Sequence, residues 1–271
     1  MNIHFIKAHG AKNDFLLTWA SQAPADPAVA IAICDRYTGV GADGWMLVDA
    51  TPGEGFDATI RLFNSDGSEP ELSGNGTRCA AALLLERGHA GEQIRIRTGA
   101  GVKHLRMLER KGSLFLFEMN MGIPRVVSLH EKIVLSSGAL EATLVDAGNP
   151  QCAYVVENFD FDWRGVGAET ERHGRFPHRT NVSFLRAAGP HTVEVRFFER
   201  GAGETMSSGT GSTGAAVTAL ARGLVRSPVT VSTPAGDLGF RQADLNSPAY
   251  LAGPTQIVAE GHYRHEIISG E

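Results

Sequence analysis

The stretch Ser73-Gly74-Asn75-Gly76-Thr77 returns 135 residues later as Ser208-Gly209-Thr210-Gly211-Ser212. It belongs to a longer repeat, because residues 61–101 align with residues 196–236 without a gap and 14 of the 41 positions are identical. Chance would give roughly two or three identities at ordinary amino-acid frequencies. A duplicated unit of this length indicates two similar domains and not a solenoid, whose repeats are shorter and more numerous. We therefore expect a site between the halves, where two like groups face one ligand.

The composition is that of an ordinary globular protein. The 271 residues are 42% apolar and 20% charged, and the net charge of −5 disfavours a nucleic-acid or anionic-membrane partner. The longest apolar run, 28–34, is too short to span a bilayer, and Met1–Phe5 does not open a secretion signal. Cysteines at 34, 79 and 152 form neither a disulfide framework nor a zinc pattern. We expect a cytoplasmic protein.

Short alternating apolar segments predict strands in both halves, for example 59–63 and 193–198. Helices are predicted over 28–36, 76–86 and 211–221, and the last two start from the repeated Ser-Gly-x-Gly turn. This pattern predicts an α+β fold, in which each half is a curved, mostly antiparallel sheet around a central alanine-rich helix.

The repeated turn is suited to holding an anion. A helix N-terminus carries unpaired N–H groups and partial positive charge, and small residues let a ligand approach that backbone. Two such turns could hold a carboxylate and place the side chains of Ser73 and Ser208 on opposite faces of the neighbouring carbon, as proton removal there requires. The alternative is that each serine is only a helix N-cap and each glycine only a turn residue.

Six ordered motifs make the whole chain resemble the diaminopimelate epimerase family. Two of them contain the turns, preceded by Asn64-Ser65-Asp66-Gly67-Ser68 and by Glu199-Arg200-Gly201-Ala202-Gly203-Glu204-Thr205. The other four are His9-Gly10-Ala11-Lys12-Asn13-Asp14-Phe15, Gly39-Val40-Gly41-Ala42-Asp43-Gly44, Gly148-Asn149-Pro150 and Arg179-Thr180-Asn181-Val182.

The resemblance implies interconversion of LL- and meso-diaminopimelate without cofactor or metal, by two bases on opposite faces of Cα. It implies two pseudo-symmetric domains, 1–119 with a C-terminal return over 264–271 and 120–263, with the site in the cleft and a homodimer as the usual assembly. The bases fall on Ser73 and Ser208. The substrate-binding positions fall on Asn13, Asn64, Asn149, Asn181, Glu199 and Arg200, with helix-end donors at Gly74, Asn75, Gly209 and Thr210. Arg200 can fork onto a carboxylate, and asparagine amides suit a ligand bearing ammonium and carboxylate groups.

This sequence departs from the family at the bases. The family has cysteines where Ser73 and Ser208 stand, and commonly a histidine where Gln151 stands. A hydroxyl is a poor base unless a neighbour takes its proton. Three functions therefore stay open. The first is amino-acid epimerisation, impaired or altered; the second is another proton-shift isomerase or dehydratase with Glu69, Glu204 or Glu199 as base; the third is amino-acid binding without catalysis.

Overall fold

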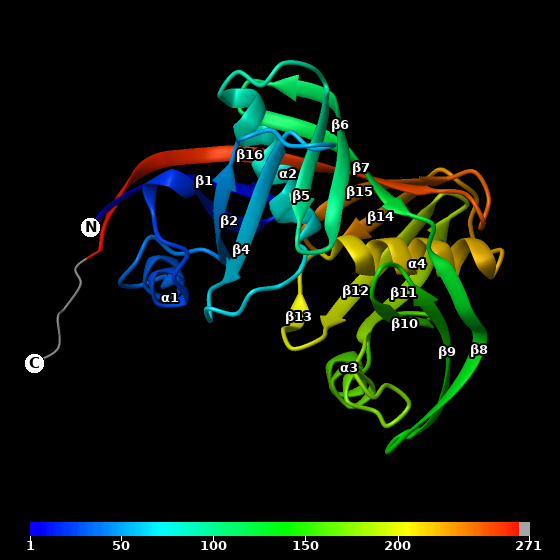
Figure 1. The fold of residues 1–271 in the computed structure, drawn as a ribbon. Coiled ribbons are helices and arrows are strands. Elements are labelled where there is room, and N and C mark those ends of the chain that lie inside the picture. The colour runs from blue at the N-terminus through cyan, green and yellow to red at the C-terminus, as the bar shows by residue number, and fades with distance from the viewer. Residues whose placement is uncertain (266–271) are drawn as a thin grey trace, which may run out of the picture. The chain divides into compact units, whose positions relative to one another are not determined.

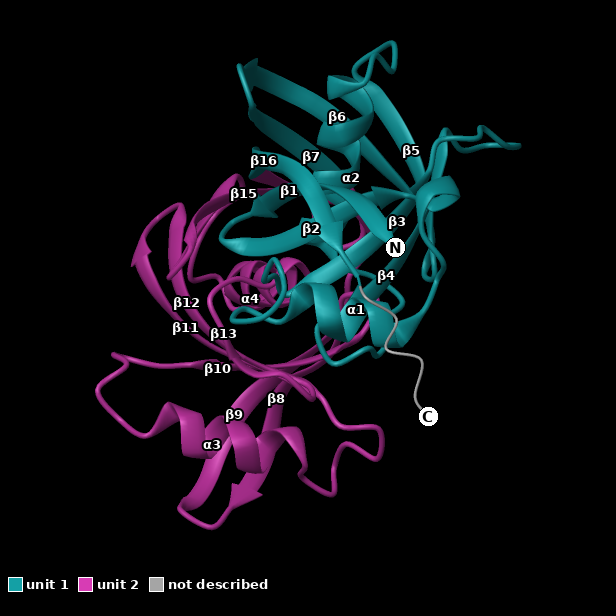
Figure 2. Cartoon of the chain, turned by 90° about the vertical axis from the view of Figure 1, so that its left-hand side faces the viewer, with its two compact units in different colours: residues 1–119, 254–271 teal, residues 120–253 magenta. Residues whose placement is uncertain are grey.

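The structure is a computed structural model and describes residues 1–265. The chain divides into two compact units, unit 1 (residues 1–119 and from 254 onward) and unit 2 (120–253), coloured separately in Figure 2. Residues 254–263, expected in the second half, therefore fall in unit 1. Most of the expected return over 264–271 lies outside the described residues. Within residues 1–265, no helix is long and apolar enough to cross a membrane.

Unit 1 is built on a barrel of eight strands (Figure 1). The strand order is β1-β2-β3-β4-β5-β6-β7-β16, and antiparallel pairing of β1 with β16, from Asn2 opposite Arg264 to His9 opposite Gln256, closes the ring. The strands are β1 Asn2–Gly10, β2 Asn13–Trp19, β3 Gly44–Asp49, β4 Ala58–Asn64, β5 Gln93–Thr98, β6 Gly101–Lys111, β7 Leu114–Gly122 and β16 Ala249–Arg264. A 3-10 turn (Ala20–Gln22) and two helices, α1 (Pro27–Cys34) and α2 (Gly74–Glu86), complete the unit.

From β9 to β16, unit 2 repeats the strand order of β1 to β7. Its path is β8-β9-β10-β11-β12-β14-β15-β16, with the short β13 paired to β12. The elements are β8 Arg125–Leu135, β9 Gly138–Asp146, β10 Pro150–Val155, α3 Trp163–Glu171, β11 Asn181–Gly189, β12 Thr192–Glu199, β13 Gly203–Thr205, α4 Gly209–Ala221, β14 Val229–Thr233 and β15 Gly236–Gln242. Parallel steps fall at matching places, β2–β3 and β4–β5 in unit 1 and β10–β11 and β12–β14 in unit 2. The sheet of each unit therefore contains two parallel steps and is otherwise mostly antiparallel, as expected.

Helices α2 and α4 occupy matching places in the two units. Residues 74–86 and 209–221 differ by the offset of the sequence repeat, and both helices begin two residues earlier than predicted. Their alanine-rich middles are buried: α2 contacts β1, β2, β5 and β6, and α4 contacts strands from β8 to β15. Small side chains allow this close packing. Each helix start is thereby held against the sheet of its own unit.

Separate aromatic cores support the two units. In unit 1, Trp45 stacks on Phe63 beneath α1, and the Trp45 indole N–H donates to Thr18 Oγ1 at 3.0 Å. In unit 2, Tyr154 and Trp163 surround Phe184, and α3 packs on this cluster. Helix α3 was not predicted, because it is only nine residues long and includes two glycines, which disfavour a helix interior.

Candidate functional site

The two repeated turns, turn 1 (residues 73–77) and turn 2 (residues 208–212), have the same backbone design. Ser73 and Ser208 both have extended backbone dihedrals, with φ and ψ of −125° and 116° at Ser73 and −138° and 127° at Ser208. Each Oγ accepts a hydrogen bond at 3.1 Å from the N–H group three residues later, on Gly76 or Gly211. Both serines are thus true N-caps. The structural role expected as the alternative, that of a helix N-cap, is therefore confirmed for both serines. This role does not exclude a chemical one.

The fourth residue of each turn has no room for a side chain. A Cβ on Gly76 would lie 2.7 Å from Met46 Cε, and one on Gly211 would lie 2.9 Å from Phe197 Cδ1 and from Ser208 Oγ. The helix start therefore packs tightly against its own sheet and its own capping serine. This packing fixes the direction in which the N–H groups of each turn point, as an anion site requires.

Ser208 is hydrogen-bonded to a half-buried carboxyl group, that of Glu199. Its Oγ donates to Glu199 Oε2 at 2.7 Å, and Thr205 Oγ1 donates to Glu199 Oε1 at 2.6 Å. Burial raises the pKa of Glu199, and the hydrogen bonds from Thr205 and Ser208 act against it without cancelling the rise. A carboxyl group with a raised pKa, bonded to a hydroxyl at a helix start, can take that hydroxyl's proton.

Ser73 has a different neighbour. The repeat places Asn64 where turn 2 has Glu199, and Asn64 Nδ2 donates to Ser68 Oγ at 2.9 Å. Ser73 is half-buried, whereas Ser208 is 4% exposed. Among residues 1–265, no carboxyl group is hydrogen-bonded to Ser73 Oγ. Turn 1 therefore has the capped helix start of turn 2 without its acid–base partner.

The other two carboxyl groups considered as bases are engaged elsewhere. Glu69 accepts two hydrogen bonds from Arg61, at 2.6 and 2.9 Å, and these bonds are the main reason that the pKa of Glu69 is lowered. Glu204 receives two from Arg164 of α3, at 2.6 and 2.8 Å. Both are surface ion pairs, so the hypothesis of Glu69 or Glu204 as the base is not supported by these contacts, and Glu199 is the remaining candidate.

The predicted binding residues of unit 2 gather around the start of α4. Asn181 lies on β11 opposite Gln151 of β10, and its Oδ1 accepts from the backbone N–H of Arg200 at 3.0 Å. Gln151 Nε2 donates to Asn149 Oδ1 at 2.5 Å, and Gln151 Oε1 is buried without a partner among the described residues. The Arg200 side chain is exposed and donates to His178 O at 3.3 Å. Gly209 and Thr210, half-buried, open α4 beside them.

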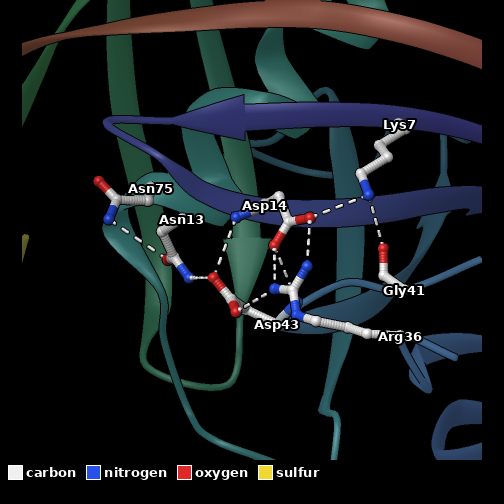
Figure 3. A network of polar contacts seen from close by, with 7 residues as sticks. All are labelled: Lys7, Asn13, Asp14, Arg36, Gly41, Asp43 and Asn75. Carbon is white, nitrogen blue, oxygen red and sulfur yellow. Dashed lines mark hydrogen bonds and ion pairs between the residues drawn. The ribbon is translucent and has the colours of Figure 1, made fainter. Parts of the chain in front are cut away.

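In unit 1, the predicted residues Asn13 and Asn75 are hydrogen-bonded to each other (Figure 3). Asn75 Nδ2 donates to Asn13 Oδ1 at 3.3 Å, and Asn13 Nδ2 donates to Asp43 Oδ2 at 2.6 Å. Gly74 is half-buried beside Asn75 at the start of α2, and Asn64 ends β4. Sequence reasoning named neither Asp43 nor Thr205 as a site residue, although both lie within the motifs that it quoted.

The three cysteines cannot act as thiolate bases near neutral pH. Burial is the leading cause that raises the pKa of Cys34, Cys79 and Cys152 to about 12 in each case. Cys79, on the buried face of α2, is fully buried, as expected for a packing residue. The chemistry of the two turns therefore rests on hydroxyl, carboxyl and amide groups.

Comparison with known proteins identifies relatives along nearly the whole chain. A family model described as diaminopimelate epimerase matches residues 5–127 and 143–258. The chain is 38% identical to the diaminopimelate epimerase of Pelotomaculum thermopropionicum, over 96% of this chain and 99% of that one. It is 37% identical to the diaminopimelate epimerase of Moorella thermoacetica, with the same coverage.

Solved structures share the fold at low sequence identity. A hydroxyproline epimerase from Agrobacterium vitis, solved with bound trans-4-hydroxy-L-proline, has a TM-score of 0.74 at 14% identity, over 96% of this chain and 92% of that chain. A methylitaconate-delta-isomerase has a TM-score of 0.70 at 12% identity, over 100% and 99% of the two chains. The α+β fold expected from the sequence is therefore that of the racemase and epimerase structures.

Proposed function

We propose that the substrate of this protein is diaminopimelate. The premise is that the chain belongs to the diaminopimelate epimerase family and is an isomerase that epimerises an amino acid. The reaction is the cofactor-independent interconversion of the LL and meso forms, which are precursors of lysine and peptidoglycan. Supporting the proposal, the relatives with this name match 96% of the chain. The two capped turns supply the group types that the reaction needs at matching positions of the repeat.

The contact between Ser208 and Glu199 carries the mechanistic part of the proposal. As Ser208 Oγ takes the proton from Cα, the Glu199 carboxylate takes the hydroxyl proton across their 2.7 Å hydrogen bond. The electron pair of the broken C–H bond remains on Cα and spreads into the substrate carboxylate, which backbone N–H groups at a helix start stabilise. Glu199 ends the step protonated, and its raised pKa favours that form.

Epimerisation also needs a proton on the opposite face, and the proposal assigns this step to Ser73. The Ser73 hydroxyl gives its proton to Cα, which forms the new C–H bond, and solvent then returns a proton to Ser73 Oγ. No carboxyl group among the described residues bonds Ser73, so this transfer is expected to be the slower one. Both serines stand where the family has cysteines, so the rate is expected to be low.

The same contact favours one second candidate, a proton shift on another carboxylate substrate. Glu199 paired with Ser208 can remove a proton next to a carboxylate whatever the remainder of the substrate is. A base on one face is enough when the electron pair moves into a double bond and no inversion follows. This candidate needs Glu199 and does not need Ser73, so the two functions are separable by mutation.

Incubation in deuterated water with LL-diaminopimelate tests the proposal. Mass spectrometry measures deuterium at Cα, and chiral chromatography measures the meso product. We expect deuterium in both isomers, with exchange in LL-diaminopimelate faster than its conversion to the meso form. Loss or movement of a double bond in a different substrate, with no exchange in diaminopimelate, would establish the second candidate. Binding of diaminopimelate without exchange would contradict the proposal.

A further inference from the structure

Four side chains of unit 1 form one run of hydrogen bonds in which every donor points the same way. This amide chain consists of Arg78, Asn75, Asn13 and Asp43, and Figure 3 shows its last three members. Arg78 Nη2 donates to Asn75 Oδ1, Asn75 Nδ2 donates to Asn13 Oδ1 at 3.3 Å, and Asn13 Nδ2 donates to Asp43 Oδ2 at 2.6 Å. The amide chain thus joins α2 to the start of β2 and to the loop before β3.

The two ends of the amide chain determine its direction. A guanidinium group only donates and a carboxylate only accepts, whereas an asparagine amide can be turned over so that its oxygen and nitrogen exchange places. Asn75 must therefore present its oxygen to Arg78, and Asn13 must present its nitrogen to Asp43. With both ends fixed, the middle bond between Asn75 and Asn13 has only one arrangement in which a donor meets an acceptor.

The Arg78 end is held by burial. Its side chain is fully buried, and its Nε and Nη1 have no hydrogen-bond partner among residues 1–265. Burial lowers the pKa of Arg78 to about 10, so the group is still a cation at neutral pH. Leaving a buried cation's donors unpaired is costly, so its hydrogen bond to the available acceptor, Asn75 Oδ1, is strongly favoured.

The Asp43 end is held by charge. Arg36 Nη2 donates to Asp43 Oδ1 at 2.7 Å, and the backbone N–H of Asp14 donates to Asp43 Oδ2 at 3.1 Å. Arg36 also bonds Asp14 at 2.8 Å, and Lys7 lies 3.0 Å from the same carboxylate (Figure 3). Burial tends to raise the pKa of Asp14, but the bonds from Arg36 and Lys7 bring it below its usual value. Asp43 itself accepts from Arg36, from the Asp14 N–H and from Asn13, so these three donors hold its carboxyl group in place.

Within the described chain, turn 2 has no equivalent of the amide chain. The repeat places Thr210 opposite Asn75 and Thr213 opposite Arg78, and Thr213 Oγ1 donates to Gly209 O at 2.9 Å within its own helix. The amide chain is therefore not a general requirement of a helix that starts from this turn. It is particular to unit 1, where two of the proposed substrate-binding asparagines, Asn13 and Asn75, stand.

We propose that Arg78 and Asp43 are positioning residues that set the amide orientation of Asn13 and Asn75. The inference rests on the proposed function, in which these asparagines bind the amino acid. The half-buried Asn13 amide keeps one N–H and one oxygen lone pair for the ligand, and Asn75, which is 4% exposed, fixes the places of both through its hydrogen bond to Asn13. A turned amide would offer an N–H where the ligand's ammonium needs an oxygen, so the amide chain selects an amino acid in one pose.

The main test is Asp43→Asn, which removes the charge at a half-exposed position and retains the size. The substituted amide would offer one oxygen to three donors, namely Arg36, the Asp14 N–H and Asn13, and the charged Arg36 would take it. We expect the KM for LL-diaminopimelate to rise about tenfold, because a binding amide loses its fixed orientation. We expect kcat to change by less than about twofold, since the proton-transfer groups are untouched.

Asp57→Asn is the matched control. Asp57 also accepts from an arginine side chain, Arg95 Nη2 at 2.8 Å, and from a backbone N–H at 2.7 Å, but no asparagine within residues 1–265 bonds it. The Asp57→Asn variant should leave the KM for LL-diaminopimelate unchanged. An equal rise in KM for both variants would overturn the proposal.

At the other end of the amide chain, Arg78→Met should raise KM as Asp43→Asn does, and Arg78→Lys should raise it less. Identical KM values for the two Arg78 variants would contradict a role for the cation.

Side-chain amide NMR of the ligand-free protein separates this inference from the proposed function. Asp43→Asn should shift the NH₂ resonances of Asn13 and Asn75, and Asp57→Asn should not. Unmoved resonances in Asp43→Asn would overturn the amide chain even if the enzyme acts on diaminopimelate. If the wild-type protein shows no exchange in diaminopimelate, the proposed function fails, and the resonances alone then decide whether the two ends orient the amides.

Discussion

Turn 1 and turn 2 share a backbone and differ in what surrounds it. Both serines cap their helices with the same 3.1 Å hydrogen bond, and both turns exclude a side chain at the fourth position. Around them, turn 2 has a carboxyl group, Glu199, bonded to its serine, and turn 1 has the amide chain. Duplication has kept the part that any anion-binding helix start needs, while the side chains beside each copy have diverged toward different tasks.

This difference predicts unequal roles for the two serines. Ser208 has a partner that can take its proton, so it is suited to removing a proton from Cα. Ser73 lacks such a partner among the described residues, and we propose that the amide chain beside it orients a ligand. An enzyme of this kind should start the reaction from one isomer more readily than from the other. The variants below test whether turn 2 is the basic side.

Glu199→Gln should have the largest effect. It retains the size of the side chain and removes the proton acceptor of Ser208, so deuterium exchange at Cα should fall by about 10²–10⁴-fold, the usual contribution of general acid–base catalysis. Exchange measured by mass spectrometry checks this. Glu204→Gln is the matched control, because Glu204 is paired with Arg164, and its exchange rate should be unchanged. Similar losses in both variants would remove the basis for assigning Glu199 as the base.

Arg200→Ala should be the next largest change, and it compares binding at the two turns. Arg200 stands where the repeat has Ser65, so of these two matched positions only the one beside turn 2 carries a cation for a substrate carboxylate. Its loss should cost about 3–5 kcal/mol in affinity for diaminopimelate if the closed site buries the pair, against about 1–3 kcal/mol for Asn64→Ala. Calorimetry measures both. Equal losses of affinity in the two variants would show that Arg200 and Asn64 contribute equally to binding the ligand.

Cysteine substitutions should reveal the weaker turn. Ser73→Cys with Ser208→Cys should raise the exchange rate at least about tenfold, because a thiol titrates much nearer neutral pH than a hydroxyl. Between the single variants, Ser73→Cys should give the larger gain in meso product, since Ser208 already has Glu199. Each thiol also weakens a helix cap, at about 1 kcal/mol, so the Tm of every variant is needed. A larger gain from Ser208→Cys would reverse the assignment of roles.

The smallest effect is on stability as a function of pH. The pKa of Glu199 is raised above its ordinary value of 4.5 in the folded protein, so the folded chain holds this proton more tightly than the unfolded chain. The stabilisation from this group is fully present below about pH 4.5 and is lost as pH rises through the folded pKa. The Tm of the wild-type protein should therefore fall relative to that of Glu199→Gln as pH rises across this window. Exchange activity should rise over the same window, and parallel Tm curves would contradict the raised pKa.

The repeat allowed most of the fold of each unit to be predicted, because local patterns determine it. The Ser-Gly-x-Gly turn and the alanines after it placed α2 and α4 to within two residues. Helix α3 was missed because it is short and contains two glycines, and because packing on Phe184 and the Asp162 cap, which stabilise it, are visible only in the fold. The closure of the barrel by β1 and β16 depends on residues from opposite ends of the chain, which no local pattern connects.

The candidate site was predictable as residue types and positions, but not as pairings. The sequence left three glutamates open as bases. In the structure, Glu69 is paired with Arg61 and Glu204 with Arg164, whereas Glu199 accepts a hydrogen bond from Ser208. Arg164 lies on the helix that was missed, so its effect on Glu204 could not be anticipated. The roles of the individual site residues are still predictions, which the variants above are designed to test.

The closing of unit 1 by β16 has a consequence for how the protein is made. Residues 120–253 are continuous, so unit 2 has all its strands up to β15 before the ribosome has produced the strand that closes unit 1. Domains that are continuous in sequence usually fold from the N-terminus onward during synthesis. Here the first unit to emerge must wait for residues 256–264 to pair with β1. Until then β1 has an unpaired edge, and an unpaired strand edge can pair with another chain and aggregate.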